Sequence, residues 1–216
     1  PVIEQFSLKQ WQSYLTFHTL NRLASFLTTE LAQQNHKFYK TQLNGVKDRK
    51  PIETRGVAVV NRYFPDVLGR LYVAKHFDPK AKIQMEDLVA ELVEAYSQLV
   101  NEADWLSEET KKQALAKIRN INKKIGYPSH WQDYSSLDIK HDDLIGNVIR
   151  TRKFQHAIEI DKINQPVNKE EWIMPPQSVN AYYNPTANEI AFPAAILQSP
   201  FFSVSTDDAV NFGGIG

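Results

Sequence analysis

The 216-residue sequence contains no cysteine. A secreted scaffold held together by disulfides is therefore excluded, and a reducing compartment is compatible with this composition. No apolar run approaches the ~20 residues that a membrane-spanning helix needs, so we expect no membrane contact within these residues. The pattern of a signal peptide is also missing, although Pro1 is not a natural start and we expect further sequence upstream.

An excess of charge of either sign is lacking, because 25 basic and 25 acidic residues cancel. No overall electrostatic field attracts the chain to nucleic acid or to an anionic membrane, so we expect no nucleic-acid partner.

Motifs for metal binding and nucleophilic catalysis are missing too. No two of the six histidines are three to five residues apart, so no helix presents a pair of them on one face. His141-Asp142-Asp143 is better interpreted as the acidic start of a helix than as a cation site. Neither a Gly-x-Ser-x-Gly elbow nor a phosphate loop occurs. We therefore predict no catalytic residue and no metal ligand within this sequence.

The sequence does contain a series of helical patterns, so the predicted fold class is mainly α. Ser7 and Gln10 form a capping box at the start of the first helix. The clearest pattern covers residues 84–101, where apolar residues recur at i, i+3, i+4 and i+7. A helix over 108–125, capped by Ser107, follows, and another is expected over about 142–161. Further helices are expected from Thr28 or Thr29 to Asn44-Gly45, over 52–64, and from Pro65 to about His76, closed by Asp78-Pro79.

Residues 178–216 have a different pattern, typical of a short β-hairpin followed by loops. Val179 to Tyr183 is rich in aromatic and β-branched residues, 184–188 has turn residues, and Glu189 to Phe192 is a second strand ended by Pro193. A strand at a sheet edge can pair its free N–H and C=O groups with an extended peptide. An ordinary surface hairpin is the alternative that the pattern leaves open.

The same region contains several specific motifs. They are Asn180-Ala181-Tyr182-Tyr183, Asn188-Glu189-Ile190, Phe192-Pro193-Ala194, Ile196-Leu197-Gln198 and Asn211-Phe212-Gly213-Gly214-Ile215-Gly216. Together they resemble the neprilysin and endothelin-converting-enzyme family of zinc endopeptidases, which includes bacterial endopeptidase O. Further matches at residues 68–73, 105–111, 125–128 and 166–172 extend the resemblance, in order, over nearly the whole chain.

The resemblance implies a partial two-lobed metallopeptidase fold. Residues 1–172 are expected to form a helical lobe with connecting helices, and 173–216 the start of a thermolysin-like catalytic lobe. In this family Gly-Gly-Ile-Gly leads into a helix carrying His-Glu-x-x-His, which holds zinc and the general base. That helix is expected just after Gly216. Zinc and the remainder of the catalytic lobe are therefore expected in the full-length protein, and this fragment alone is expected to bind no metal and to be inactive.

The resemblance also implies a function and a set of substrate-binding residues. The family's Asn-Ala-x-Tyr strand binds the main chain of oligopeptide substrates, a role that fits the two-way hydrogen bonding of an Asn amide. The expected substrate-binding residues are Asn180, Ala181, Tyr182, Tyr183, Phe192 and Phe201. Glu189 is interpreted as structural, because the family's general base lies on the helix after Gly216.

Two alternatives stay open at this point. One is a non-catalytic helical module whose hairpin captures an extended peptide or a partner strand, and the other is a protein that kept the fold and lost the zinc ligands. A glycine at position 56, where we expect vertebrate relatives to carry cysteine, favours a bacterial protein located in the cytoplasm.

Overall fold

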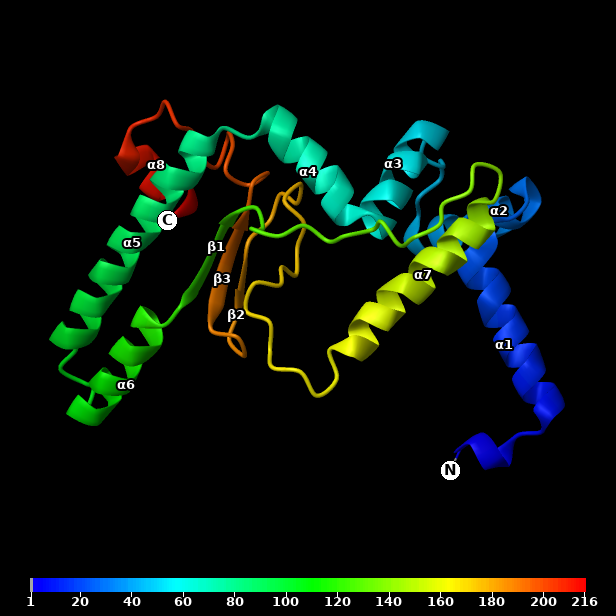
Figure 1. Cartoon of the computed structure of the whole chain (residues 1–216), viewed down its shortest axis with the longest axis horizontal. Helices are drawn as coiled ribbons and strands as arrows, with labels where there is room; N and C mark the ends of the chain where they lie inside the picture. Colours follow the sequence, from blue (N-terminus) through cyan, green and yellow to red (C-terminus); the bar gives the residue numbers. More distant parts are fainter. Residues whose placement is uncertain (1) are drawn as a thin grey trace. The chain divides into compact units, whose positions relative to one another are not determined.

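The computed structural model describes residues 2–216, and the chain folds as two units (Figure 1). The first unit comprises Pro1–Tyr63 and Tyr134–Ile163, and the second comprises Phe64–Asp133 and Asn164–Gly216. The fold is mainly α, with one small sheet in the second unit, as the sequence predicts. Within the described residues no helix has both the length and the apolar character needed to cross a membrane.

Among the described residues of the first unit, the regular secondary structure is all helical. The helices are η1 (Val2–Gln5), α1 (Leu8–Leu23), η2 (Ala24–Phe26), α2 (Thr29–His36), the π-helical η3 (Lys37–Gln42), α3 (Ile52–Tyr63) and α7 (Leu144–Asp161). The predicted capping box is confirmed, since Ser7 accepts a hydrogen bond from the Gln10 backbone and Gln10 accepts one in return. Tyr63 is buried between α3 and α7, where its hydroxyl accepts a hydrogen bond from Arg152 Nε at 3.2 Å.

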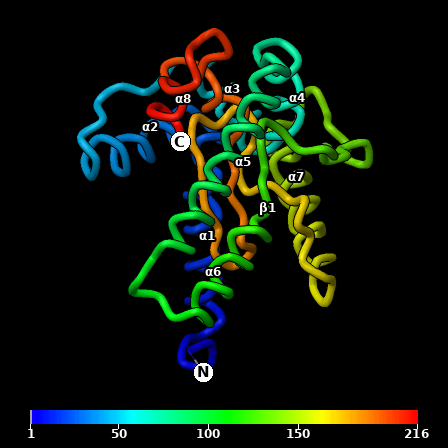
Figure 2. The backbone as a smooth tube through the Cα atoms, turned by 90° about the vertical axis from the view of Figure 1, so that its left-hand side faces the viewer, coloured from blue at the N-terminus to red at the C-terminus, as the bar shows by residue number. Residues whose placement is uncertain are grey.

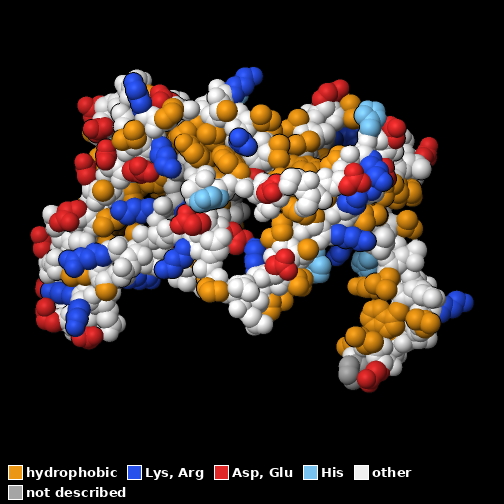
Figure 3. Space-filling view, viewed as in Figure 1, with side chains coloured by type: hydrophobic (Ala, Val, Ile, Leu, Met, Phe, Trp, Pro, Cys, Tyr) orange, Lys and Arg blue, Asp and Glu red, His pale blue; other side chains and the backbone are white. Residues whose placement is uncertain are grey.

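Apolar side chains cover much of the surface of η1 and α1 (Figure 3). Phe6 and Trp11 meet edge to face with ring centroids 6.0 Å apart, and Trp11 meets Tyr14 in the same way at 5.7 Å. No residue of α1 is buried within this chain. The capping box, rather than a buried stripe, is therefore the local feature that defines where this helix begins.

The second unit contains four helices in addition to its sheet. They are α4 (Pro65–His76), α5 (Pro79–Glu102), α6 (Glu108–Arg119) and α8 (Asp208–Ile215). α5 begins at Pro79, five residues before the predicted start, because Asp78 caps it by accepting a hydrogen bond from Lys80 N at 2.9 Å. The predicted apolar stripe of α5 is confirmed in its first half, where Met85, Leu88 and Val89 are buried. Near the end of the helix Tyr96 and Leu99 are 59% and 61% exposed.

The sheet has three strands in the order β1-β3-β2. β2 (Tyr182–Asn184) and β3 (Glu189–Pro193) form the predicted antiparallel hairpin, and β1 (Asn122–Gly126) pairs with β3 in parallel. The predicted helix over 108–125 is therefore wrong in its last part, because α6 ends at Arg119. Ile121 and Ile125 are four residues apart, which fits a helix, but residues 122–126 gain backbone partners from β3 instead.

The two faces of this sheet differ in character. On one face Ile125, Ile190 and Phe192 pack with the apolar stripe of α5, which runs beside β1 in both ribbon views (Figure 1 and Figure 2). The residues between them on the strands point to the opposite face, which carries Lys124, Glu189 and other polar side chains. The core therefore fixes the sheet from one side and leaves a polar layer on the other.

α8 already contains the glycines that were expected to precede a helix. It begins at Asp208, and Asp207 caps it by accepting a hydrogen bond from Ala209 N at 2.9 Å. A methyl group at position 214 would lie 2.6 Å from the carbonyl oxygen of Phe201. Gly214 therefore allows a close approach of the Phe201 backbone. At Gly213, apart from the backbone of α8 itself, no described residue lies within 4 Å of an added methyl group.

Candidate functional site

The hairpin presents β2 as an edge strand, since only β3 pairs with it among the described residues. Alternate residues of an edge strand turn their N–H and C=O groups away from the sheet, where an extended chain can pair with them. β2 starts at Tyr182, three residues later than predicted. The reason is local: the Ala181 N–H donates to the Asn180 Oδ1 at 2.9 Å rather than to β3.

Asn180 and Ala181 therefore lie immediately before the edge strand, and both are exposed. The side-chain oxygen of Asn180 holds the Ala181 N–H, while its NH₂ group donates to no other group in the described part of the chain. The exposed amide of Asn180 can donate to the main chain of a second polypeptide. The small side chain of Ala181 leaves room for that main chain to approach.

Tyr182 connects this edge to the polar face of the sheet. Its half-buried hydroxyl accepts a hydrogen bond from Ile173 N at 3.4 Å and donates one to Glu189 Oε1 at 3.3 Å. Burial raises the pKa of the Tyr182 phenol, and the nearby Glu189 carboxylate adds to the rise. The phenol is therefore neutral at physiological pH and keeps the proton that it donates.

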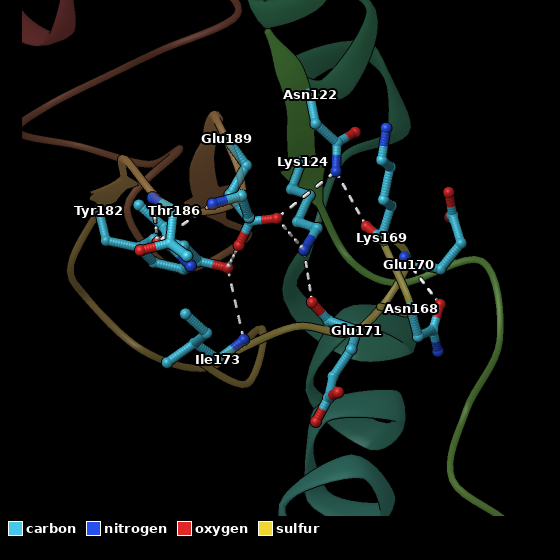
Figure 4. A network of polar contacts seen from close by, with 12 residues as sticks. Asn122, Lys124, Asn168, Lys169, Glu170, Glu171, Ile173, Tyr182, Thr186 and Glu189 are labelled. Carbon is cyan, nitrogen blue, oxygen red and sulfur yellow. Dashed lines mark hydrogen bonds and ion pairs between the residues drawn. The ribbon is translucent and has the colours of Figure 1, made fainter. Parts of the chain in front are cut away.

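Glu189 is the centre of this polar layer (Figure 4). Its Oε2 lies 2.6 Å from Lys124 Nζ, and the two side chains are only 4% and 5% exposed. Lys124 also donates to the carbonyl oxygen of Glu171, and Asn122 Nδ2 lies 3.5 Å from the same Glu189 oxygen. All its close partners among the described residues belong to the fold, which supports the structural interpretation of Glu189, and its role stays a prediction.

The remaining candidate residues lie elsewhere. Tyr183 is exposed on the opposite face of β2, and its ring centroid is 5.8 Å from Lys117 Nζ. Phe192 packs half-buried against the core, and Phe201 is 41% exposed beside α8. The structure thus brings Asn180, Ala181 and Tyr182 together, does not gather all six residues into one pocket, and leaves their substrate-binding role a prediction.

Sequence reasoning missed Lys124, the residue that balances the Glu189 charge. It lies in Asn122-Lys123-Lys124-Ile125-Gly126, which has no alternation of apolar and polar residues to indicate a strand. Two adjacent lysines at the end of a helical pattern also suit the helix dipole, so the sequence offered a reason to place them on a helix. No signal within β1 itself could have identified its partner.

A zinc site cannot be built from the described residues. Nowhere in residues 2–216 do three His, Cys, Asp or Glu side chains come close enough together to hold a metal ion. Glu189, the buried carboxylate nearest the edge strand, already pairs with Lys124. The described residues alone therefore do not assemble a zinc site.

Comparisons with known proteins match both ends of the chain to one family. Models described as peptidase family M13 match residues 2–128 and 180–216. Human neprilysin is 33% identical over 224 residues, an alignment that covers 100% of this chain and 30% of neprilysin. Neutral endopeptidase from Lactobacillus helveticus is 30% identical over 217 residues, covering 100% of this chain and 33% of the relative.

Solved structures agree with these sequence matches. The crystal structure of the Mycobacterium tuberculosis zinc metalloprotease Zmp1 in complex with an inhibitor is 42% identical, with a TM-score of 0.90 over 98% of this chain and 32% of that one. PepO from Lactobacillus rhamnosis is 30% identical, with a TM-score of 0.87 over 97% of this chain and 33% of that one. The chain thus spans about a third of the length of the relatives that it matches. On the strength of the family models, which together match most of its residues, the chain belongs to peptidase family M13.

Proposed function

We propose that the full-length protein containing this chain is a zinc-dependent endopeptidase that hydrolyses oligopeptides. In this proposal the chain supplies the strand that binds the substrate main chain, while zinc and the general base are held by residues outside it. Membership of family M13 supports the reaction class. The observation that carries the chain's own role is the edge strand β2, preceded by the exposed Asn180 and Ala181.

The substrate would bind by strand addition. An extended peptide aligned with β2 pairs its main chain with the outward N–H and C=O groups, and this pairing is independent of peptide sequence. The NH₂ group of Asn180 would donate to a substrate carbonyl, and Ala181 has no side chain long enough to block the approach. Tyr182 would keep the strand in place from behind. Tyr183, Phe192 and Phe201 are proposed to line side-chain pockets.

The proposed division of the chain places the helical lobe and connecting helices in residues 1–172 and the start of the catalytic lobe in 173–216. The separate family-model matches over 2–128 and 180–216 support a two-part organisation. In space, the strand β1 from the first part pairs with β3 from the second. The cytoplasmic location stays a prediction.

The proposal is tested with the full-length protein and a fluorogenic oligopeptide. We expect cleavage that a zinc chelator abolishes and added zinc restores. Asn180→Ala should raise KM about tenfold with little change in kcat, because losing a main-chain hydrogen bond costs ~1.4 kcal/mol. Asn101→Ala, an exposed Asn on α5 away from the sheet, is the control and should leave KM unchanged.

Two results would decide against this function. Absence of any zinc-dependent cleavage by the wild-type protein refutes the endopeptidase. Peptide binding without turnover would favour the alternative, a non-catalytic helical module with a peptide-binding edge.

A further inference from the structure

The polar face of the sheet contains a buried ion pair that has no part in the strand addition proposed above. Lys124 on β1 and Glu189 on β3 lie 2.6 Å apart, and neither side chain is more than 5% exposed. Lys124 is on the strand farthest from the binding edge, with β3 between them. It cannot touch a peptide bound at β2, so any effect of Lys124 on substrate must pass through other residues.

The strand register shows how such an effect is transmitted. Lys124, Ala191 and Tyr182 are direct neighbours across the three strands, so their side chains form one row on the polar face. Ala191 is fully buried in the middle of this row. Because its methyl group is short, Lys124 from one side and Tyr182 from the other both reach the carboxylate of Glu189, one row further along the same face.

The same residues fix the segment that precedes the hairpin. Lys124 Nζ donates to the Glu171 carbonyl, Asn122 Nδ2 donates to the Lys169 carbonyl at 2.9 Å, and Ile173 N donates to the Tyr182 hydroxyl (Figure 4). Tyr182 is therefore attached at its backbone to β3 and at its hydroxyl both to Glu189 and to the connecting segment.

A buried ion pair is not an efficient way to stabilise a fold. Removing two charges from water costs about as much as their attraction returns, and an apolar pair of similar size is often equally stable or more so. What an ion pair does provide is a defined geometry, since each charge requires its partner at one place. Here that geometry ends at Tyr182, the first residue of the edge strand and two positions after Asn180.

We propose that Lys124 is a positioning residue for substrate binding, which acts through Glu189 and Tyr182 to hold the Asn180–Ala181 segment in line with β2. This inference rests on the proposed function. A shift of one residue in strand register reverses every side chain, and a displacement of about 1 Å in a bound group has large effects on turnover. Without the ion pair β2 can still pair with β3, but Asn180 and Ala181 are no longer held in line with it.

The test uses the zinc-loaded full-length enzyme and reports KM, kcat per active site and melting temperature. Lys124→Met leaves Glu189 buried without its partner, and we expect a lower melting temperature together with a KM raised about tenfold. Tyr182→Phe removes only one hydroxyl group and should raise KM by a smaller factor, about threefold. Leu88→Ala is the matched control, because Leu88 is buried on α5 in the apolar core: it should lower the melting temperature and leave KM unchanged.

The double variant Lys124→Met/Glu189→Leu separates positioning from stability. Replacing both charges by apolar groups should restore the melting temperature, while KM stays raised because the Tyr182 hydroxyl has lost its bond to Glu189. The positioning role is wrong if KM and melting temperature both recover in the double variant. It is also wrong if Lys124→Met lowers only the melting temperature, as Leu88→Ala does. In either case the proposed endopeptidase activity is unaffected. If Lys124→Met is not recovered as folded protein, an unchanged KM in Tyr182→Phe overturns the inference. A wild-type enzyme without zinc-dependent cleavage overturns both proposals.

Discussion

Replacing Gly69 with alanine should destabilise the second unit, although alanine is the better helix former. Gly69 is buried in α4, and a methyl group at this position would lie 2.9 Å from Cδ of Pro176 and 2.9 Å from Oε1 of Gln177. Neither neighbour moves easily. The Pro176 ring is fully buried, and Gln177 donates through Nε2 to the Pro65 carbonyl on the same helix at 3.0 Å.

The expected magnitude follows from two opposing terms. Alanine gains about 1 kcal/mol of helix propensity over glycine. Carbon atoms reach their best separation at about 3.5–4.0 Å, so the new methyl group must force a shift of roughly half an ångström or more, and such overpacking typically costs about 1–3 kcal/mol. We expect a net loss of about 0–2 kcal/mol for Gly69→Ala.

Gly56→Ala is the matched control, because Gly56 is also inside a helix, α3, and apart from the backbone of α3 itself no described residue lies within 4 Å of the added methyl group. It should gain about 0.5–1 kcal/mol. Hydrogen exchange measured by mass spectrometry gives the opening free energies of α3 and α4 separately, so the measurement does not require the two units to unfold together.

Pro176→Ala removes the obstructing ring, and in that background Gly69→Ala should cost less by about 1 kcal/mol or more. The reasoning is refuted if Gly69→Ala stabilises α4 as much as Gly56→Ala stabilises α3.

Three further predictions follow from single residues. Met85→Ala, at a fully buried position of α5, should lower the free energy of unfolding by about 2–5 kcal/mol in urea titration, whereas Ile83→Ala on the exposed side of α5 should change it by less than about 0.5 kcal/mol. Ser7→Ala removes the cap of α1 and should cost about 1 kcal/mol; exchange of the first α1 amides that is no faster than in wild type would contradict this. Because the pKa of Tyr182 is raised on folding, its contribution to stability is present below a pH of about 10 and is lost as the pH rises through the folded-state pKa. Urea unfolding of Tyr182→Phe should therefore show a shallower loss of stability above about pH 10, and an unchanged pH dependence would count against the buried phenol.

Elements that depend on nearby residues could be predicted from the sequence. The α5 stripe repeats at helical spacing, and the Ser7 and Ser107 caps need only residues three positions away. The hairpin followed from a turn between two β-prone segments, and its loop spans only residues 185–188. In each case the partners lie within a few residues, so the physical cause is visible in a short window.

β1 could not be predicted because its cause is distant. Asn122 pairs with Glu189, 67 residues later, and the pairing outweighs a local pattern that suits a helix. The same limit applies to the candidate site. The family motifs indicated Asn180 and Ala181, whereas Lys124 joins the site only because a parallel strand places it beside β3.

The position of β1 also decides which edge of the sheet is open. Lys124, Ile125 and Gly126 are all buried, and a methyl group at Gly126 would meet the Phe77 ring at 3.3 Å, so the β1 edge is largely covered by its own unit. β2 has no fully buried residue and no strand on its outer side within the described residues.

An exposed strand edge is normally an aggregation hazard, and a length of only three residues is one way in which proteins reduce that hazard. A strand of three residues has few backbone hydrogen bonds to hold it in place. The contacts from Lys124 through Glu189 to Tyr182 supply further support from the polar face. The strand missing from the sequence prediction is thus the one that makes the predicted binding edge physically plausible.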